Sequence, residues 1–214
     1  MAGIMLLCCV VNIGDAAKLS KIARKYGVTD GTISIGRGTV HNRILEFLKI
    51  NEIRREIVTM IVKTELATEA IQGISDEMAF EKPHHGIAFT YAVSELIDGA
   101  GRTAANPNIS EVKDSVYKSI YVVVDKGRAE DVIEAANQAG ARGGTVVNAR
   151  GSGIHEAQKF FSIEIEPEKE QVFIITKTEL KDGIIAAIRE RLGMDEPGNG
   201  IIFVLDVHEA YGLH

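Results

Sequence analysis

Hydrophobic and polar positions follow one another in blocks that predict six elements in the first half of the chain. Residues 5–12 form an apolar run typical of a buried strand. Leu19, Ile22 and Tyr26 recur at the spacing of one helix face, and this pattern stops at Gly27. We predict strands at residues 5–12, 32–35, 57–62 and 87–93, and helices at residues 16–26 and 65–78. The order of elements is βαββαβ.

The second half of the chain repeats the first. Residues that recur at an offset of 113 are Gly27 as Gly140, Gly31 as Gly144 and Arg37 as Arg150. One inserted residue near Ser152 raises the offset to 114, so that Lys63-Thr64-Glu65-Leu66 recurs as Lys177-Thr178-Glu179-Leu180. Such a repeat is typical of a duplicated domain. The repeated elements are strands at residues 119–125, 145–149, 172–177 and 201–207, and helices at residues 129–139 and 179–192.

This element order predicts the fold class α+β. The split βαβ pattern is that of a ferredoxin-like domain, in which two helices cover one face of an antiparallel sheet. We therefore expect two tandem ferredoxin-like domains, at residues 1–98 and 115–214. Residues 99–114 contain Ala-Ala-Asn-Pro-Asn and few large apolar residues, which predicts a linker.

Composition excludes several classes of protein. The chain has 214 residues and a formal net charge of −6, so no global field attracts nucleic acid and any anion site must be local. The longest apolar run, from Ile4 to Val11, is shorter than the roughly 20 residues that a membrane helix needs. Cys8 and Cys9 would point to opposite faces of a strand, which favours packing thiols over a reactive one. We expect a cytoplasmic protein without membrane insertion.

The connection between the second and third strands of each repeat is much longer than an ordinary hairpin loop. It begins Gly36-Arg37-Gly38 in the first repeat and Arg150-Gly151-Ser152-Gly153 in the second. Glycines let backbone N–H groups approach an anion, and the Arg guanidinium offers a fork of donors to phosphate or carboxylate. The alternative is that these glycines only turn the chain.

Two turns and one exposed motif have both a chemical and a structural interpretation. Gly198-Asn199-Gly200 could offer backbone donors to a phosphate or form an ordinary turn. His84-His85 could bind a metal or lie exposed in the matching turn. In Lys63-Thr64-Glu65, the sequence predicts a structural role, with Thr64 capping the helix and Lys63 in solvent.

These features together resemble the nitrogen-regulatory P-II signalling family, in tandem. The resemblance implies trimers of ferredoxin-like domains that bind adenine nucleotides (ATP, ADP or AMP) between domains and regulate a partner such as a transporter or enzyme through a long loop. Gly151-Ser152-Gly153 is similar to the family's Gly-aromatic-Gly at the base of that loop. Lys169, with Arg55 as its counterpart in the first repeat, resembles the basic residue entering the third strand, and Gly198-Asn199-Gly200 resembles the Gly-Asp-Gly phosphate loop.

The chain also departs from that family pattern. Ile201 stands where a lysine normally follows the phosphate loop, and no Lys or Arg occurs from His208 to His214, which argues against strong triphosphate binding. No tyrosine occurs between Arg150 and Lys169, so regulation by uridylylation of that loop is not expected.

The leading hypothesis is a non-enzymatic signalling protein, trimeric or pseudo-symmetric, that senses a small anionic effector and regulates a partner protein. Its expected ligand-binding residues are Arg37, Gly38, Arg55, Arg150, Gly151, Ser152, Gly153, Lys169, Gly198, Asn199 and Gly200. The alternative is a metal-binding trimer similar to the divalent-cation-tolerance proteins, using His41, His84, His85 and His155. A third hypothesis is an enzyme, but the candidate residues Arg150, His155 and Lys169 do not make up a set of acid, base and nucleophile.

Overall fold

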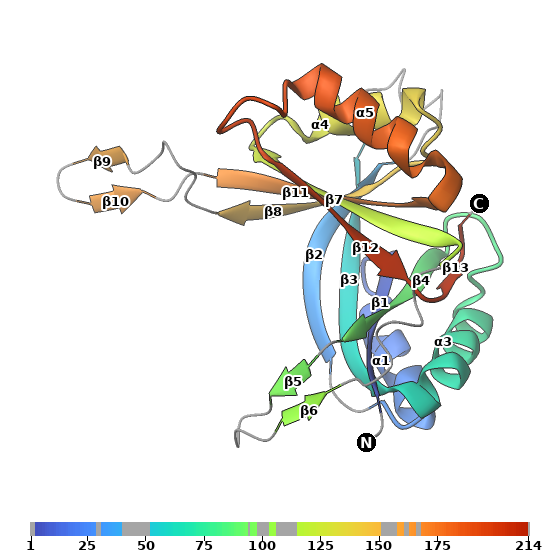
Figure 1. Cartoon of the computed structure of the whole chain (residues 1–214). Helices are drawn as coiled ribbons and strands as arrows, with labels where there is room; N and C mark the ends of the chain where they lie inside the picture. The colour runs from blue at the N-terminus through green and yellow to red at the C-terminus, as the bar shows by residue number, and fades with distance from the viewer. Residues whose placement is uncertain are drawn as a thin grey trace. The chain divides into compact units, whose positions relative to one another are not determined.

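The computed structural model describes residues 3–28, 31–39, 52–93, 95–97, 103–105, 115–150, 158–160, 163–165 and 168–213. The chain divides into two compact units (Figure 1). Unit 1 comprises Met1–Ile35, Arg54–Tyr117 and Asp206–His214, and unit 2 comprises Gly36–Ile53 and Lys118–Leu205. Among the described residues, no helix is both long enough and apolar enough to cross a membrane.

Unit 1 has the predicted βαββαβ order. Its elements are β1 (Ile4–Asn12), α1 (Ala16–Lys25), the first part of β2 (Gly31–Thr39), β3 (Glu52–Lys63), α3 (Thr64–Met78) and β4 (Gly86–Val93). β1 lies between β3 and β4 and is antiparallel to both, and β2 lies beside β3. β13 (Ala210–Tyr211) adds to the outer side of β4.

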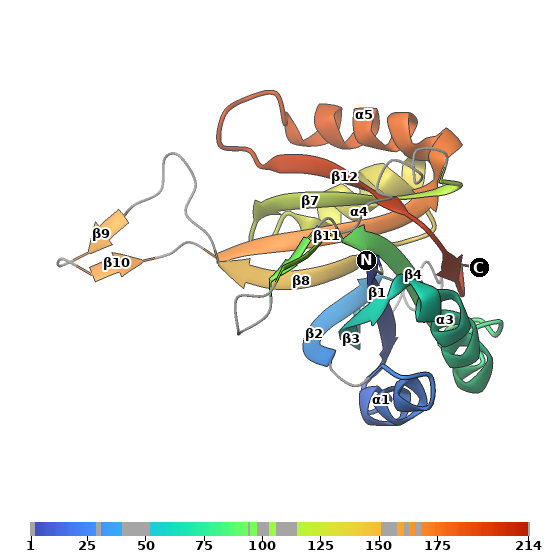
Figure 2. The ribbon, with the colours of Figure 1, turned by 60° about the horizontal axis from the view of Figure 1, so that its bottom comes forward.

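The core of unit 1 lies between its strands and its two helices, which share one side of the sheet (Figures 1 and 2). Alternate residues of β1 enter this core, from Met5 through Cys9 to Val11, as the period of a strand requires. Leu19 of α1 and Ile71 of α3 are fully buried against them. Cys8 is buried outside this cluster, which confirms that the two cysteines point to opposite faces.

Unit 2 repeats the order of elements. It contains β7 (Tyr117–Asp125), α4 (Ala129–Gln138), β8 (Thr145–Arg150), β11 (Glu168–Lys177), the short 3-10 helix η2 (Thr178–Leu180), α5 (Lys181–Leu192) and β12 (Ile201–Val207). The strands lie in the order β12, β7, β11, β8, and residues of β2 pair with β8. Ile120, Val172 and Ile188 are completely buried between this sheet and its helices. The expected α+β, ferredoxin-like fold class is confirmed.

The boundaries of the two compact units differ from those of the two sequence repeats. Residues 36–53 come from the first repeat but belong to unit 2, and residues 206–214 come from the second repeat but belong to unit 1. Two small hairpins stand apart from the main strands: β5 (Glu95–Ile97) pairs with β6 (Thr103–Ala105), and β9 (Gln158–Phe160) pairs with β10 (Ile163–Ile165). β6 lies within the stretch that the sequence predicts as a linker.

Two local predictions need correction. The second strand was expected to end at Ile35, but β2 continues to Thr39, because Arg37 and Gly38 pair with Val146 and Thr145 of β8. Thr64 does not cap α3: it is the first helical residue, Lys63 holds the N-cap position, and no side-chain cap hydrogen bond forms. The Lys63 side chain is exposed, as predicted.

Candidate functional site

Three segments of unit 1 meet around the guanidinium of Arg55: the end of β1, the start of β3 and the turn before β4. Asn12 faces Arg55 across the β1–β3 pair. Arg55 Nη1 donates a hydrogen bond to Asn12 Oδ1 and lies 3.5 Å from the carbonyl oxygen of His84, and Asn12 Nδ2 donates to that carbonyl at 3.4 Å. Asn12, Arg55 and His84 are named here the Arg55 cluster.

Arg55 is a buried cation held by neutral oxygens. Only 8% of the residue is exposed. Burial lowers the pKa of its guanidinium from the ordinary 12.5, and the negative charge of Asp15 acts in the opposite direction. Within the described residues Arg55 forms no ion pair, and both of its hydrogen-bond acceptors are amide or peptide oxygens. The cluster therefore carries a positive charge that is not neutralised by a direct carboxylate contact.

Unit 2 has the same arrangement with a different charge balance. Asp125 and Lys169 occupy the positions that Asn12 and Arg55 occupy in unit 1, and they form an ion pair. The Lys169 side chain is 12% exposed. A carboxylate therefore neutralises the basic residue in unit 2, whereas an uncharged amide meets it in unit 1.

The Gly198-Asn199-Gly200 turn and its counterpart at residues 84–86 pack against the end of the first strand of their unit. Gly200 has φ +133°, and a Cβ there would lie 2.3 Å from the carbonyl oxygen of Val123. Gly86 has φ +145°, and a Cβ there would lie 2.7 Å from the carbonyl oxygen of Val10. These glycines are needed for close approach of the backbone. Asn199 Nδ2 donates to the carbonyl oxygen of Gly193 at 2.8 Å, so its side chain also stabilises the turn.

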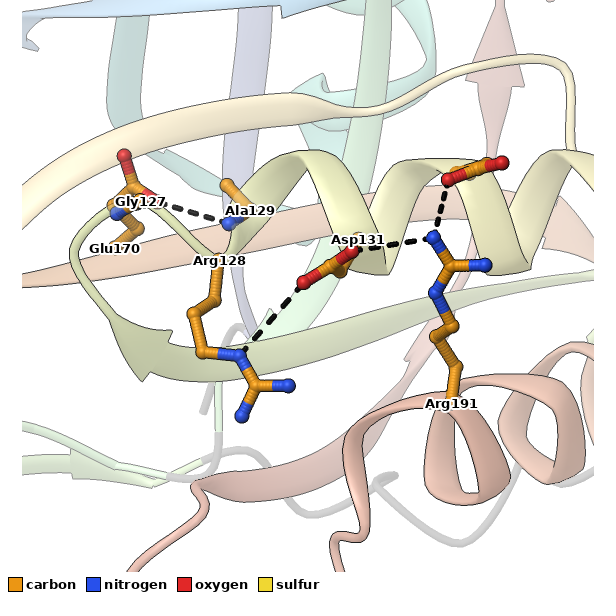
Figure 3. A network of polar contacts seen from close by, with 7 residues as sticks. Gly127, Arg128, Ala129, Asp131, Glu170 and Arg191 are labelled. Atoms are coloured by element: carbon orange, nitrogen blue, oxygen red, sulfur yellow. Dashed lines mark hydrogen bonds and ion pairs between the residues drawn. The ribbon is translucent and has the colours of Figure 1, made fainter.

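A glutamate next to each basic residue holds the start of the first helix of its unit. In unit 1, Glu56 Oε2 accepts the backbone N–H groups of Gly14 at 3.0 Å and Ala16 at 2.8 Å. In unit 2, Glu170 Oε2 accepts those of Gly127 at 3.0 Å and Ala129 at 2.9 Å (Figure 3). Sequence reasoning missed both glutamates, although their recurrence at the offset of 114 was a visible signal.

Arg37 contacts this helix-capping carboxylate in unit 2. Its guanidinium forms an ion pair with Glu170 Oε1, and Glu170 is buried. Gly38 pairs with Thr145 in the β2–β8 ladder. Arg37 therefore already pairs with a carboxylate of the protein itself. A second arginine of unit 2, Arg191, lies beside α4 and pairs with Asp131 at 3.3 Å and with Glu134 at 2.5 Å (Figure 3).

The remaining candidates are only partly described. The backbone of Arg150 pairs with Glu168 across β8 and β11. The Arg150 side chain and the residues Gly151, Ser152 and Gly153 lie outside the described part of the chain. His41 and His155 also lie outside it, and the described residues contain no group of three or more His, Cys, Asp or Glu side chains arranged to hold a metal. His84 and His85 are exposed in their turn.

Comparison with known protein families finds a match in the second half of the chain. Residues 117–214 match the family model of nitrogen regulatory protein P-II. The second half of the chain is therefore similar to the P-II family. This P-II match contains the Asp125–Lys169 pair, the Gly198–Gly200 turn and Glu170, and it also contains the C-terminal segment that packs in unit 1.

One matching solved structure is the crystal structure of Arabidopsis thaliana PII bound to citrate. It is 29% identical to this chain over 43% of this chain and 75% of that chain, with a TM-score of 0.34. No curated protein matches the chain.

Proposed function

We propose that this protein is a P-II-type signalling regulator whose first repeat senses a small anionic effector at the Arg55 cluster. The observation that carries the proposal is the buried Arg55 guanidinium, which is held only by neutral oxygens within the described residues. An opposite charge within hydrogen-bond reach stabilises a buried cation, and an anionic ligand would supply that charge.

The second repeat supports this assignment by contrast. Asp125 already supplies a carboxylate to Lys169, the counterpart of Arg55. An anion entering at Lys169 would have to compete with Asp125. We therefore assign the stronger anion site to the first repeat, where Asn12 replaces the aspartate.

Adenine nucleotides are the effector class that the P-II resemblance favours, and the His84 carbonyl of the turn before β4 lies 3.5 Å from Arg55 Nη1. Effector binding would change the conformational equilibrium of the long connections and so regulate a partner protein such as a transporter or enzyme. We further propose that residues 1–98 and 115–214 are tandem P-II domains that act without catalysis and assemble as a homo-oligomer.

The proposal is tested by calorimetry and thermal shift with ATP, ADP, AMP, cyclic AMP, citrate and inorganic phosphate. Two variants remove the unneutralised positive charge of the Arg55 cluster in different ways. Arg55→Gln deletes the cation, and Asn12→Asp places a carboxylate beside it, as Asp125 lies beside Lys169 in the second repeat. We expect each variant to weaken binding of the best ligand at least tenfold. Lys169→Gln is the matched control and should leave that affinity within about twofold.

Two results would contradict the proposal. The first is that none of these anions binds the wild-type protein. The second is binding that Arg55→Gln and Asn12→Asp leave unchanged. A ligand that Lys169→Gln weakens and Arg55→Gln does not would instead place the anion site in the second repeat.

A further inference from the structure

The outward side of α1 in unit 1 carries basic side chains and no acidic one. Its exposed basic residues are Lys18, Lys21, Arg24 and Lys25. At 3.6 residues per turn, these positions cover about a third of the helix circumference, opposite the side on which Leu19 is fully buried. We name these four residues the basic face of α1.

Most of this positive charge has no partner within the described part of the chain. Lys25 Nζ pairs with Glu77 of α3 at 2.5 Å, and Lys18 adds a weaker electrostatic attraction to the same carboxylate. Among the described residues, Lys18, Lys21 and Arg24 form no ion pair and no side-chain hydrogen bond. Their donor groups are therefore available to a ligand.

Helix stability does not account for the position of Lys18. The N-terminal end of a helix carries partial positive charge, so a cation is unfavourable in the first turn and favourable in the last. Arg24 and Lys25 lie in the last turn, but Lys18 lies in the first turn, where α1 has no acidic residue. The equivalent helix α4 has Glu130 and Asp131 in its first turn. Lys18 thus occupies a position at which the helix itself favours a carboxylate.

The two repeats carry opposite charges at equivalent positions of this helix. At the offset of 113, Lys18 corresponds to Asp131 and Lys21 corresponds to Glu134. In unit 2, Arg191 binds that carboxylate pair at 3.3 Å and 2.5 Å. The fold therefore already contains one contact between a basic side chain and two carboxylates three residues apart on a helix.

We propose that the basic face of α1 is a docking surface for an acidic segment of the regulated partner protein, with carboxylates three or four residues apart. This inference names the partner's chemistry and so rests on the proposed function, but it uses no residue of the Arg55 cluster. Lys18 and Lys21 are separated by about 4.5 Å along the helix axis, which matches carboxylates at that spacing on a facing helix. Complementary charge steers such an encounter and selects the partner.

The surroundings of the basic face favour a narrow segment over a membrane surface. The neighbouring helix α3 packs beside α1 (Figures 1 and 2). Its exposed acidic residues are Glu65, Glu69, Asp76 and Glu77. An extended anionic bilayer lying against α1 would also meet these carboxylates and be repelled by them. A single acidic segment can lie along α1 alone.

Fluorescence anisotropy with the full chain tests the proposal. The probe is a labelled alanine-based helical peptide whose glutamates recur three or four residues apart. We expect binding that weakens as salt is added and that disappears when glutamine replaces every glutamate of the peptide. The double variant Lys18→Gln with Lys21→Gln should weaken binding about tenfold without lowering the melting temperature.

The matched control is Lys63→Gln with Lys177→Gln. Both lysines are exposed and lie outside α1, and the net charge changes by the same amount. This control should leave peptide affinity within about twofold of the wild-type value. A wild-type protein that does not bind the peptide, or equal weakening in the two double variants, would overturn the proposal.

Two further measurements separate this inference from its alternatives. The variant Lys18→Gln with Lys21→Gln should keep wild-type affinity for the anion that binds best at the Arg55 cluster. If no anion binds but the peptide does, the proposed effector site fails and the docking surface stands. Vesicles containing phosphatidylserine should bind more weakly than the peptide. Tighter binding to vesicles, lost in the same variant, would make the basic face a membrane contact and overturn the assignment to a protein partner.

Discussion

The Glu170 side chain accepts the backbone N–H of Ala129, the first residue of α4, at 2.9 Å. The first N–H groups of a helix lack partners within the helix and carry partial positive charge. A buried carboxylate at this position supplies both a hydrogen-bond acceptor and a negative charge. Glu56 does the same for Ala16 of α1 at 2.8 Å. In both units the third strand therefore fixes the start of the first helix.

We expect Glu170→Ala to lower the free energy of unfolding by about 3 kcal/mol, because it leaves two helix N–H groups and the Arg37 cation without this carboxylate. Glu56→Ala should cost less, about 1–2 kcal/mol, because no ion pair to Glu56 occurs in the described residues. Urea denaturation of both variants measures the difference. Glu190→Ala, on the exposed side of α5, is the control, and equal losses for all three would contradict the capping role.

Two helix glycines should respond in opposite directions to substitution by alanine. A Cβ at Gly183 of α5 meets nothing within 4 Å, so Gly183→Ala should stabilise the protein by about 0.5–1 kcal/mol through helix propensity. A Cβ at Gly73 of α3 would lie 2.1 Å from the Tyr26 ring, so Gly73→Ala should destabilise it by about 1–3 kcal/mol. Thermal denaturation compares the two, and a shift of the same sign in both would disprove the packing argument.

Burial of the cysteines predicts a loss of stability in alkali. Burial raises the pKa of the Cys8 thiol from 9.0 to about 12 and raises that of Cys9 as well. Between these values the unfolded chain releases the Cys8 proton while the folded protein retains it, so the free energy of unfolding falls as pH rises above 9. Urea midpoints at pH 8 and pH 10.5 measure this decline. In Cys8→Val the decline should be smaller, because the contribution of the Cys8 thiol is removed, and an identical decline would exclude a contribution from Cys8.

The sequence predicted the elements well because hydrophobic periodicity is a local signal. The strand expected at residues 201–207 coincides with β12, and the helix expected at residues 65–78 differs from α3 by one residue. The extension of β2 through Gly36-Arg37-Gly38 was missed because these residues have little strand propensity and pair with β8, far along the chain. The exchange of residues 206–214 into unit 1 depends on the same kind of non-local pairing.

The candidate site was predictable in position but not in charge balance. The repeat offset identified Arg55 and Lys169 as equivalent basic residues, and both lie beside the end of the first strand of their unit. The difference in charge becomes visible only when the strands are paired: Asp125 neutralises Lys169, whereas Asn12 leaves Arg55 charged. For Thr64 the local rule was wrong: it predicted a helix cap, but Thr64 is the first residue of α3 and Lys63 holds the N-cap position.

The segment that covers the outer side of β4, residues 208–211, should depend on the Glu209 side chain for its attachment. Glu209 Oε1 accepts the Thr68 hydroxyl at 2.6 Å, and Oε2 accepts the Tyr211 hydroxyl at 3.4 Å, so one carboxylate ties residues 209–211 to α3. We expect Glu209→Ala to cost about 1 kcal/mol, because the carboxylate is partly exposed, and to raise the exchange rate of the Thr90 amide about fivefold.

Hydrogen exchange followed residue by residue measures this opening directly, because the Thr90 N–H donates to the Glu209 carbonyl. Amides of β1, which pair with the inner side of β4 and with β3, should keep their wild-type rates. Thr68→Val should reproduce most of the effect, since it removes the shorter of the two hydrogen bonds. Leu213→Ala is the control within the same tail. If Thr90 exchanges at the wild-type rate in Glu209→Ala, the backbone ladder alone holds the segment and the carboxylate contributes nothing to the cover.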